Sequence, residues 1–298
     1  MGESLPLAYR IKAERAYNAL PPLFTIAGTF LIIGLVMLAA AMRRMIRGNF
    51  SSTRVGKKYV PEIFKIVGVA AAFVFFLVLT IVLGLFWIAS GHIPFSNGAE
   101  TMLTIAWTAM LASVLSFKRF SIMLPFGIIV ASLAALVSAM GNANPAVTQL
   151  MPVLSSPLLS IHVSLMMLSY TVLAIIMVNG ICGLVASLRH TSVSDSASAK
   201  MARMSEALMY PALFFLGSGI IAGSIWANVS WGCYWNWDPK ETWALITFLI
   251  ASLGVHRTRL PFLRSHRAYH IYTQILSASV LFTYFGVNYL LGGMHSYA

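Results

Sequence analysis

Five of the chain's seven tryptophans fall within residues 226–243, where an even distribution would place fewer than one. Amphipathic Trp and Tyr rings collect at membrane interfaces, which explains one or two tryptophans at a helix end but not a dense cluster in one segment. A broad aromatic surface suits a large planar apolar ligand, because stacking and edge contacts bury such a ligand at little entropic cost. We therefore predict that Trp231, Trp235 and Trp237 form a binding platform.

Two histidines flank this segment from a distance. His162 begins an apolar run, and His295 lies three residues before the end of the chain. Neutral imidazole is a common axial ligand of haem iron, and two histidines on opposite sides of an aromatic platform would make a six-coordinate site. Either histidine alone would be interpreted as an interfacial polar side chain. The prediction of a haem site therefore depends on the placement of both histidines with the tryptophans.

Asp238, Pro239 and Glu241 form a helix-start pattern, with Asp at the N-cap, Pro at the first helical position and Glu at the third. This predicts that a helix begins here and that Asp238 caps it, with a ligand role as the alternative. His256 lies 17 residues beyond Pro239, about 26 Å along a helix. By itself it reads as part of a basic edge, as do His190, His266 and His270.

The elements that must position these residues are membrane-spanning helices. The 298 residues are 59% hydrophobic and 9% charged, and a membrane helix needs about 20 apolar residues. The apolar runs are continuous rather than alternating, which disfavours a β-barrel. We expect an all-α integral membrane protein, a bundle of about eight transmembrane helices with an external tryptophan-rich loop. The expected spans are 23–42, 64–90, 101–116, 121–139, 161–188, 212–228, 240–256 and 271–291.

The distribution of Lys and Arg predicts the orientation. Sixteen of the 20 basic residues fall in the segments after the first, third, fifth and seventh spans, which the positive-inside rule places in the cytoplasm. Both termini and residues 226–243 are then outside, and the net charge of +12 does not indicate nucleic-acid binding. We expect residues 189–205, rich in Ser and Ala, to be a flexible linker. No cleavable signal peptide is expected in the first 20 residues.

The segment from Trp231 to Trp243 (WGCYWNWDPKETW) closely resembles the tryptophan-rich "WWD" motif of haem-handling proteins in cytochrome c biogenesis. It is most similar to the CcsA (ResC) family of the system II pathway. Supporting stretches are PFSNGAE at 94–100, SIHVS at 160–164 and GMHSY at 293–297. The resemblance covers roughly residues 85–298, and Cys233 departs from the small residue common in the family. The predicted organisation is an N-terminal segment and first helix over 1–60, followed by a CcsA-like domain over 61–298.

The resemblance implies roles for individual residues. His162 and His295 match the external histidine pair that binds haem iron. His256 matches a histidine used for an inner haem site within the membrane, whose second ligand comes from a CcsB (ResB)-like partner. Trp231, Trp235, Trp237 and Asp238 fall within the haem-binding motif, and Asn228, Asn236 and Lys240 are candidate donors to the haem propionates.

The implied function is haem transport to the outer face and presentation of haem b, as ligand and substrate, for thioether attachment to apocytochrome c. The chain would be the haem-binding part of a holocytochrome c synthase. Expected partners are the CcsB-like protein, an apocytochrome with a C-x-x-C-H segment, a thiol-reducing thioredoxin-like protein and membrane lipid. The expected location is a bacterial inner membrane, alternatively a thylakoid membrane. The alternatives are a haem exporter or chaperone without synthase activity, and a b-type electron-transfer subunit.

Overall fold

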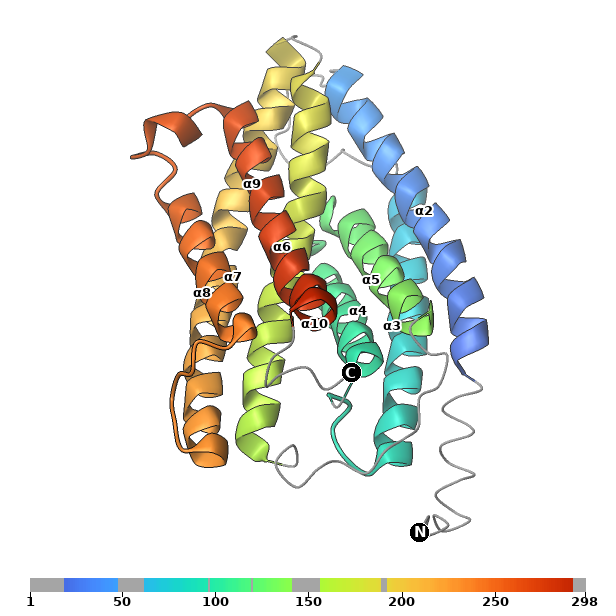
Figure 1. The fold of residues 1–298 in the computed structure, drawn as a ribbon. Helices are drawn as coiled ribbons and strands as arrows, with labels where there is room; N and C mark the ends of the chain where they lie inside the picture. Colours follow the sequence, from blue (N-terminus) through green and yellow to red (C-terminus); the bar gives the residue numbers. More distant parts are fainter. Residues whose placement is uncertain are drawn as a thin grey trace. The chain divides into compact units, whose positions relative to one another are not determined.

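The computed structural model describes residues 19–47, 62–95, 97–118, 120–140, 156–188 and 192–291, and the regular structure in these ranges is helical (Figure 1). The helices are α2 (Leu20–Arg47), α3 (Glu62–Ser90), α4 (Gly98–Ser116), α5 (Met123–Met140), α6 (Pro157–Ser187), α7 (Ser192–Trp231), α8 (Pro239–Val255), the short η2 (Pro261–Leu263) and α9 (His266–Leu281). The last helix continues from α9 through η3 (Phe282–Gly286), a π-helical turn, into α10 (Val287–Leu290).

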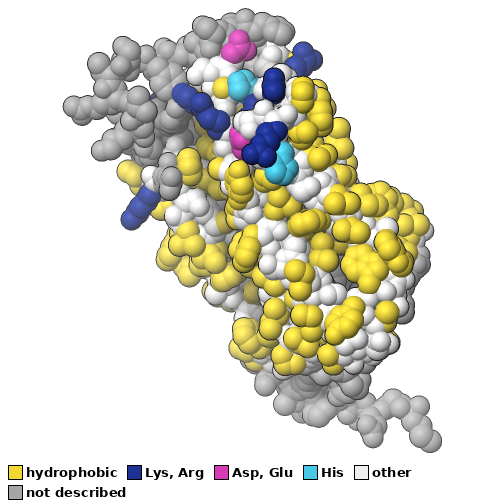
Figure 2. Space-filling view, turned by 90° about the vertical axis from the view of Figure 1, so that its left-hand side faces the viewer, with side chains coloured by type: hydrophobic (Ala, Val, Ile, Leu, Met, Phe, Trp, Pro, Cys, Tyr) yellow, Lys and Arg dark blue, Asp and Glu magenta, His cyan; other side chains and the backbone are white. Residues whose placement is uncertain are grey.

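The membrane class predicted from the apolar runs is confirmed. Helices α2 to α7 are each long and apolar enough to cross a membrane. Helix α8 has 17 residues, and the continuous run from α9 to α10 completes the set. Each expected span therefore coincides with a helix, and several helices extend beyond their apolar runs. Figure 2 shows one face on which apolar side chains predominate and most Lys, Arg and His side chains gather toward one end.

The expected flexible linker over 189–205 is wrong where the structure describes it, because α7 begins at Ser192 and continues for 40 residues. Several of its small side chains are buried, among them Ala197, Ala202 and Ser205. The buried Asn179 amide of α6 donates to the Met201 carbonyl and to the Ser205 hydroxyl, both at 2.7 Å. The Ser/Ala-rich composition at the start of α7 therefore allows close packing between helices.

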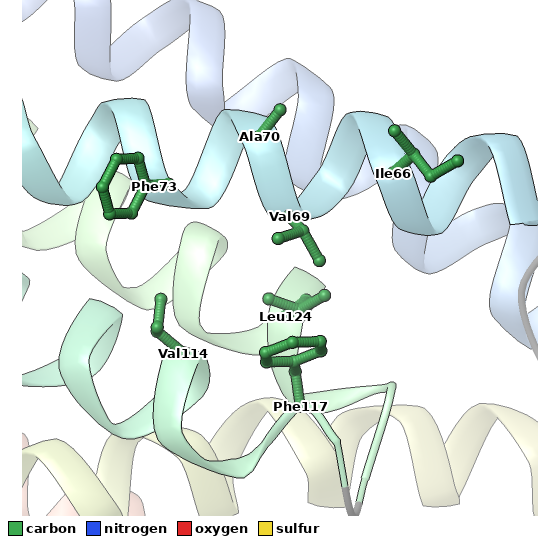
Figure 3. Close-up of a pocket in the computed structure, with 7 residues that line it drawn as sticks. All are labelled: Ile66, Val69, Ala70, Phe73, Val114, Phe117 and Leu124. Atoms are coloured by element: carbon green, nitrogen blue, oxygen red, sulfur yellow. The ribbon is translucent and has the colours of Figure 1, made fainter.

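The chain forms two compact units, one of residues 1–37 and 63–160 and the other of residues 38–62 and 161–298. The first unit contains a cavity of about 470 Å³ between α3, α4 and α5 (Figure 3). All seven lining side chains are apolar: Ile66, Val69, Ala70, Phe73, Val114, Phe117 and Leu124. Because none of them can ligate iron or bind a carboxylate, this cavity does not have the composition of the predicted site.

The second unit contains α6 to α10, and its helices are joined by buried polar contacts. The Ser169 hydroxyl of α6 donates to the Ala212 carbonyl of α7 at 2.9 Å. His270 of α9 is fully buried, with its Nε2 3.1 Å from the Ser198 carbonyl of α7. The sequence placed His270 with the basic residues at this end of the helices, and the structure buries its ring between α9 and α7.

Candidate functional site

His162 lies in the first turns of α6, and its imidazole occupies a niche in α7. Its Nδ1 is 2.7 Å from the Gly219 carbonyl oxygen. A Cβ on Gly223 would lie 2.6 Å from the same Nδ1, and a Cβ on Gly219 would lie 2.7 Å from the Met166 sulfur. Small residues at i and i+4 let membrane helices approach closely. Gly223 therefore admits the imidazole to this face of α7, and Gly219 admits the Met166 side chain beside it.

The niche also determines which ring nitrogen of His162 carries the proton. A carbonyl oxygen only accepts hydrogen bonds, so the neutral ring donates from Nδ1 to Gly219 and keeps its lone pair on Nε2. Metal-ligating histidines commonly donate their other ring N–H to a backbone carbonyl in this way. The structure therefore holds His162 in a tautomer suited to iron ligation.

The tryptophan loop, residues 231–238, connects α7 to α8. Trp231 ends α7, and Gly232 follows with a φ of 77°, a left-handed conformation that glycine adopts at little cost. Trp231 is 44% exposed and Trp237 is 70% exposed, and the Trp237 ring meets that of Trp235 edge to face at 5.9 Å. The loop thus displays a broad aromatic surface outside the helices.

The two outer tryptophans of the sequence cluster have a different role. Trp226 is buried in α7, at 1% exposure, and contacts Trp231 edge to face at 6.4 Å. Trp243 is in α8 and packs on Phe282, with ring centroids 4.2 Å apart. Only the three central tryptophans therefore belong to the loop surface.

The helix cap predicted at Asp238 is confirmed. The Asp238 carboxylate accepts from the Lys240 backbone N–H at 3.1 Å. The Glu241 carboxylate reaches back to the N–H groups of Asn236 at 2.9 Å and Asp238 at 3.2 Å. This capping box orders the end of the tryptophan loop through backbone contacts. A ligand role for Asp238 stays a prediction.

Trp237 has a φ of 56°, in the left-handed region that side chains other than glycine seldom occupy. This conformation costs about 1–2 kcal/mol for an ordinary L-residue. The ring is nevertheless mostly exposed, so burial does not offset the cost. Outliers of this kind cluster at functional sites, where surrounding contacts maintain them.

Trp237→Gly and Trp237→Ala both remove the ring, but only glycine relieves the left-handed strain. The glycine variant is therefore expected to be the more stable by about 1 kcal/mol. Thermal unfolding of the two variants in detergent measures the difference. Equal unfolding midpoints would show that the positive φ of Trp237 carries no strain.

The structure places the described site residues in two separate regions of the second unit, toward opposite ends of α8. About 12 Å of α7 separates Gly223, beside His162, from Trp231. His256 is the exposed C-cap of α8, at the opposite end of that helix from Asp238. His295 lies outside the described residues. His162 and the tryptophan loop thus share one region, and His256 lies away from the loop.

Arg257, next to His256, organises the connection between α8 and α9 and was not singled out from the sequence. Its side chain is 6% exposed. Its contacts are Glu206 at 3.4 Å, the carbonyls of Leu263 at 3.2 Å and Arg264 at 3.3 Å, the Nδ1 of His266 at 2.6 Å and the Tyr269 ring at 4.6 Å. Burial and the adjacent Arg257 guanidinium lower the pKa of His266, which keeps its ring neutral and able to accept.

The fold and these residues define a multi-pass helical membrane protein with an exposed tryptophan loop and a histidine seated against the neighbouring helix. Residues 95–295 match the Cytochrome C assembly protein family. The chain belongs to this family, as a CcsA-type cytochrome c biogenesis protein.

Known relatives support this membership. CcsA of Guillardia theta is 33% identical over 270 residues, covering 80% of this chain and 88% of that protein. NrfI of Wolinella succinogenes is 32% identical over 303 residues, covering 99% of this chain, which spans about a third of NrfI (32%). The structure of "Cytochrome c Heme Lyase CcmF" superposes with a TM-score of 0.62 at 16% identity, covering 91% of this chain and 46% of that one. This last likeness concerns the fold alone.

Proposed function

We propose that the chain binds haem between His162 and His295, against Trp231, Trp235 and Trp237, and presents it for covalent attachment to apocytochrome c. The observation that carries this proposal is the seating of His162, whose Nδ1 donates to the Gly219 carbonyl and whose Nε2 keeps its lone pair. The aromatic surface of the tryptophan loop, in the same compact unit, suits a flat apolar substrate.

The attachment reaction places few chemical demands on this chain. Each thiol of a C-x-x-C-H segment adds across a haem vinyl C=C bond, forming a C–S bond at one carbon while the thiol proton ends on the other. The addition is balanced without an oxidant, but both cysteines must arrive reduced, which is the task of a thioredoxin-like reductant. The chain contributes proximity, since holding the vinyl groups beside the thiols makes a bimolecular step effectively unimolecular.

We further propose that the tryptophan loop and both termini face outward, from a bacterial inner membrane or a thylakoid membrane, because basic residues concentrate in the alternate connections. Haem b from the cytoplasm would first meet His256, with its second ligand supplied by a CcsB (ResB)-like partner. The alignment of this chain with about a third of NrfI (32%) is compatible with a machinery that has further parts.

The test is co-expression with a CcsB-like partner, purification, and absorption spectroscopy with a holocytochrome assay on a C-x-x-C-H peptide. His162→Ala and His295→Ala should each lose most haem absorbance assigned to the external site and most attachment. His92→Ala is the matched control, because this half-buried ring lies against the neighbouring Ile93 carbonyl, at 2.9 Å, and should leave both readouts unchanged.

Three results decide the proposal. Unchanged haem content and maturation in both histidine variants would overturn it. Haem binding without attachment to the peptide would favour a haem exporter or chaperone. Reversible electron transfer by tightly retained haem, without attachment, would favour a b-type electron-transfer subunit.

A further inference from the structure

The last helix contains a π-helical turn, η3, directly before α10. A Cβ on Gly286 would lie 2.6 Å from the Phe282 ring, so glycine is required for this ring to occupy its place. Single π-turns within α-helices occur frequently at functional sites. The turn changes the direction in which the following residues are presented, and those residues lead toward the C-terminal segment.

This π-turn is attached to the first half of α8. The Phe282 ring packs on Trp243, and the Thr283 hydroxyl is 3.3 Å from the Trp243 carbonyl. One turn further along, the buried Thr247 hydroxyl is 2.9 Å from that of Thr283 and 2.7 Å from that of Ser279. These buried hydroxyls hydrogen-bond to one another, as buried polar groups generally must. The contacts fix the register of α8 against the last helix.

A charged contact lies above these hydroxyls, next to the tryptophan loop. The Lys240 ammonium donates to the Asn288 side-chain oxygen at 2.8 Å. Lys240 is in the first turn of α8, where the helix dipole disfavours a cation. The Asp238 carboxylate at the N-cap attracts this cation, and its hydrogen-bond partner is on α10.

The π-turn also contacts the helix that carries His162. The Tyr284 ring meets the Tyr170 ring of α6 edge to face at 6.1 Å, and Tyr170 follows His162 by two helical turns. Three helices thus meet at one place: α6 after His162, α8 after the tryptophan loop, and the last helix before His295, which follows Asn288 by seven residues.

We propose that Lys240 and Asn288 are positioning residues that tie the start of α8 to the last helix, and so set where the tryptophan loop meets haem held by His162. This inference rests on the proposed function. Lys240 was a candidate donor to a haem propionate, and its hydrogen bond to Asn288 gives it a second role in the protein framework.

The experiment compares Lys240→Ala, Asn288→Ala and the double variant, each purified with the CcsB-like partner. Each single change should reduce retained external haem about fivefold, as for the loss of about 1 kcal/mol of coupling. The double variant should be no worse than either single one, because both remove the same contact. Lys200→Ala, an exposed lysine far along α7 from the tryptophan loop, is the control.

Two further measurements separate positioning from general destabilisation. Added imidazole should restore the haem absorbance of His295→Ala but not that of Lys240→Ala, because a small axial ligand replaces a lost ring and does not reposition the tryptophan loop. The exchanged pair, Lys240→Asn with Asn288→Lys, should recover haem retention, since it rebuilds the hydrogen bond. The exchange also remains informative if Lys240→Ala fails to fold.

Additive losses, recovery of Lys240→Ala by imidazole or failure of the exchanged pair would each overturn the positioning role. Normal haem in Lys240→Ala and Asn288→Ala, with haem lost in His162→Ala and His295→Ala, would overturn this inference and leave the proposed function intact. Normal haem in all four variants would overturn the proposed function as well.

Discussion

Replacing Gly223 with alanine is expected to lower external haem retention about tenfold, equivalent to about 1.4 kcal/mol of binding free energy. The new methyl group would stand 2.6 Å from the His162 Nδ1, so the imidazole must leave the niche and give up its hydrogen bond to the Gly219 carbonyl. The ring then loses both its orientation and its fixed tautomer. Haem absorbance per purified protein and holocytochrome yield measure the effect.

Gly223→Ala is expected to weaken haem binding without destabilising the helix, so the two effects can be separated. Alanine favours a helix over glycine by about 1 kcal/mol, so Gly223→Ala should not unfold α7. Gly84→Ala in α3 is the matched control, because a Cβ there meets nothing within 4 Å. A Gly223→Ala protein that retains haem like the unaltered chain would contradict the niche as the seat of an iron ligand.

The second large effect is expected for Arg257→Ala. Removing one member of a buried ion pair costs about 3–5 kcal/mol, and the partial exposure of Glu206 (23%) places this case at about 3 kcal/mol. The carbonyls of Leu263 and Arg264 would lose their charged donor as well. We expect a lower midpoint of thermal unfolding, faster proteolysis of the α8–α9 connection and weaker haem binding at the predicted inner site beside His256.

Arg257→Lys should recover little of this stability, because one ammonium cannot reproduce the planar set of donors that contacts several acceptors. Arg259→Ala is the control, since its side chain is exposed in the same connection. Equal unfolding midpoints for Arg257→Ala and Arg259→Ala would show that the buried guanidinium does not hold this connection together.

Features that depend on neighbouring residues in the sequence could be predicted. The cap from Asp238 to Glu241 follows from residue types at adjacent positions, and the structure reproduces it. The membrane spans follow from hydropathy alone, because lipid requires every backbone group to be satisfied within the helix. The tryptophan loop could be located for the same reason, since it lies between two such spans.

Features that depend on packing between distant segments were missed. His270 stands among basic residues in the sequence but is fully buried against Ser198, 72 positions away. The start of α7 looked like a linker because Ser and Ala are common in both loops and tight interfaces. The niche for His162 had a visible signal, the Gly219-x-x-x-Gly223 spacing, but that spacing does not specify which side chain fills it.

Helix α7 has a mechanical consequence. Its 40 residues extend about 60 Å, twice the roughly 30 Å thickness of a bilayer's hydrocarbon layer. A large part of its polar first half must therefore lie beyond the lipid tails. This part is continuous with the second half of the same helix, against which the His162 ring packs. Pro211, which lacks the usual backbone donor, lies between the two parts. Contacts from Asn179 of α6 and His270 of α9 hold the projecting part, so a displacement at its end would reach the His162 niche through three helices together.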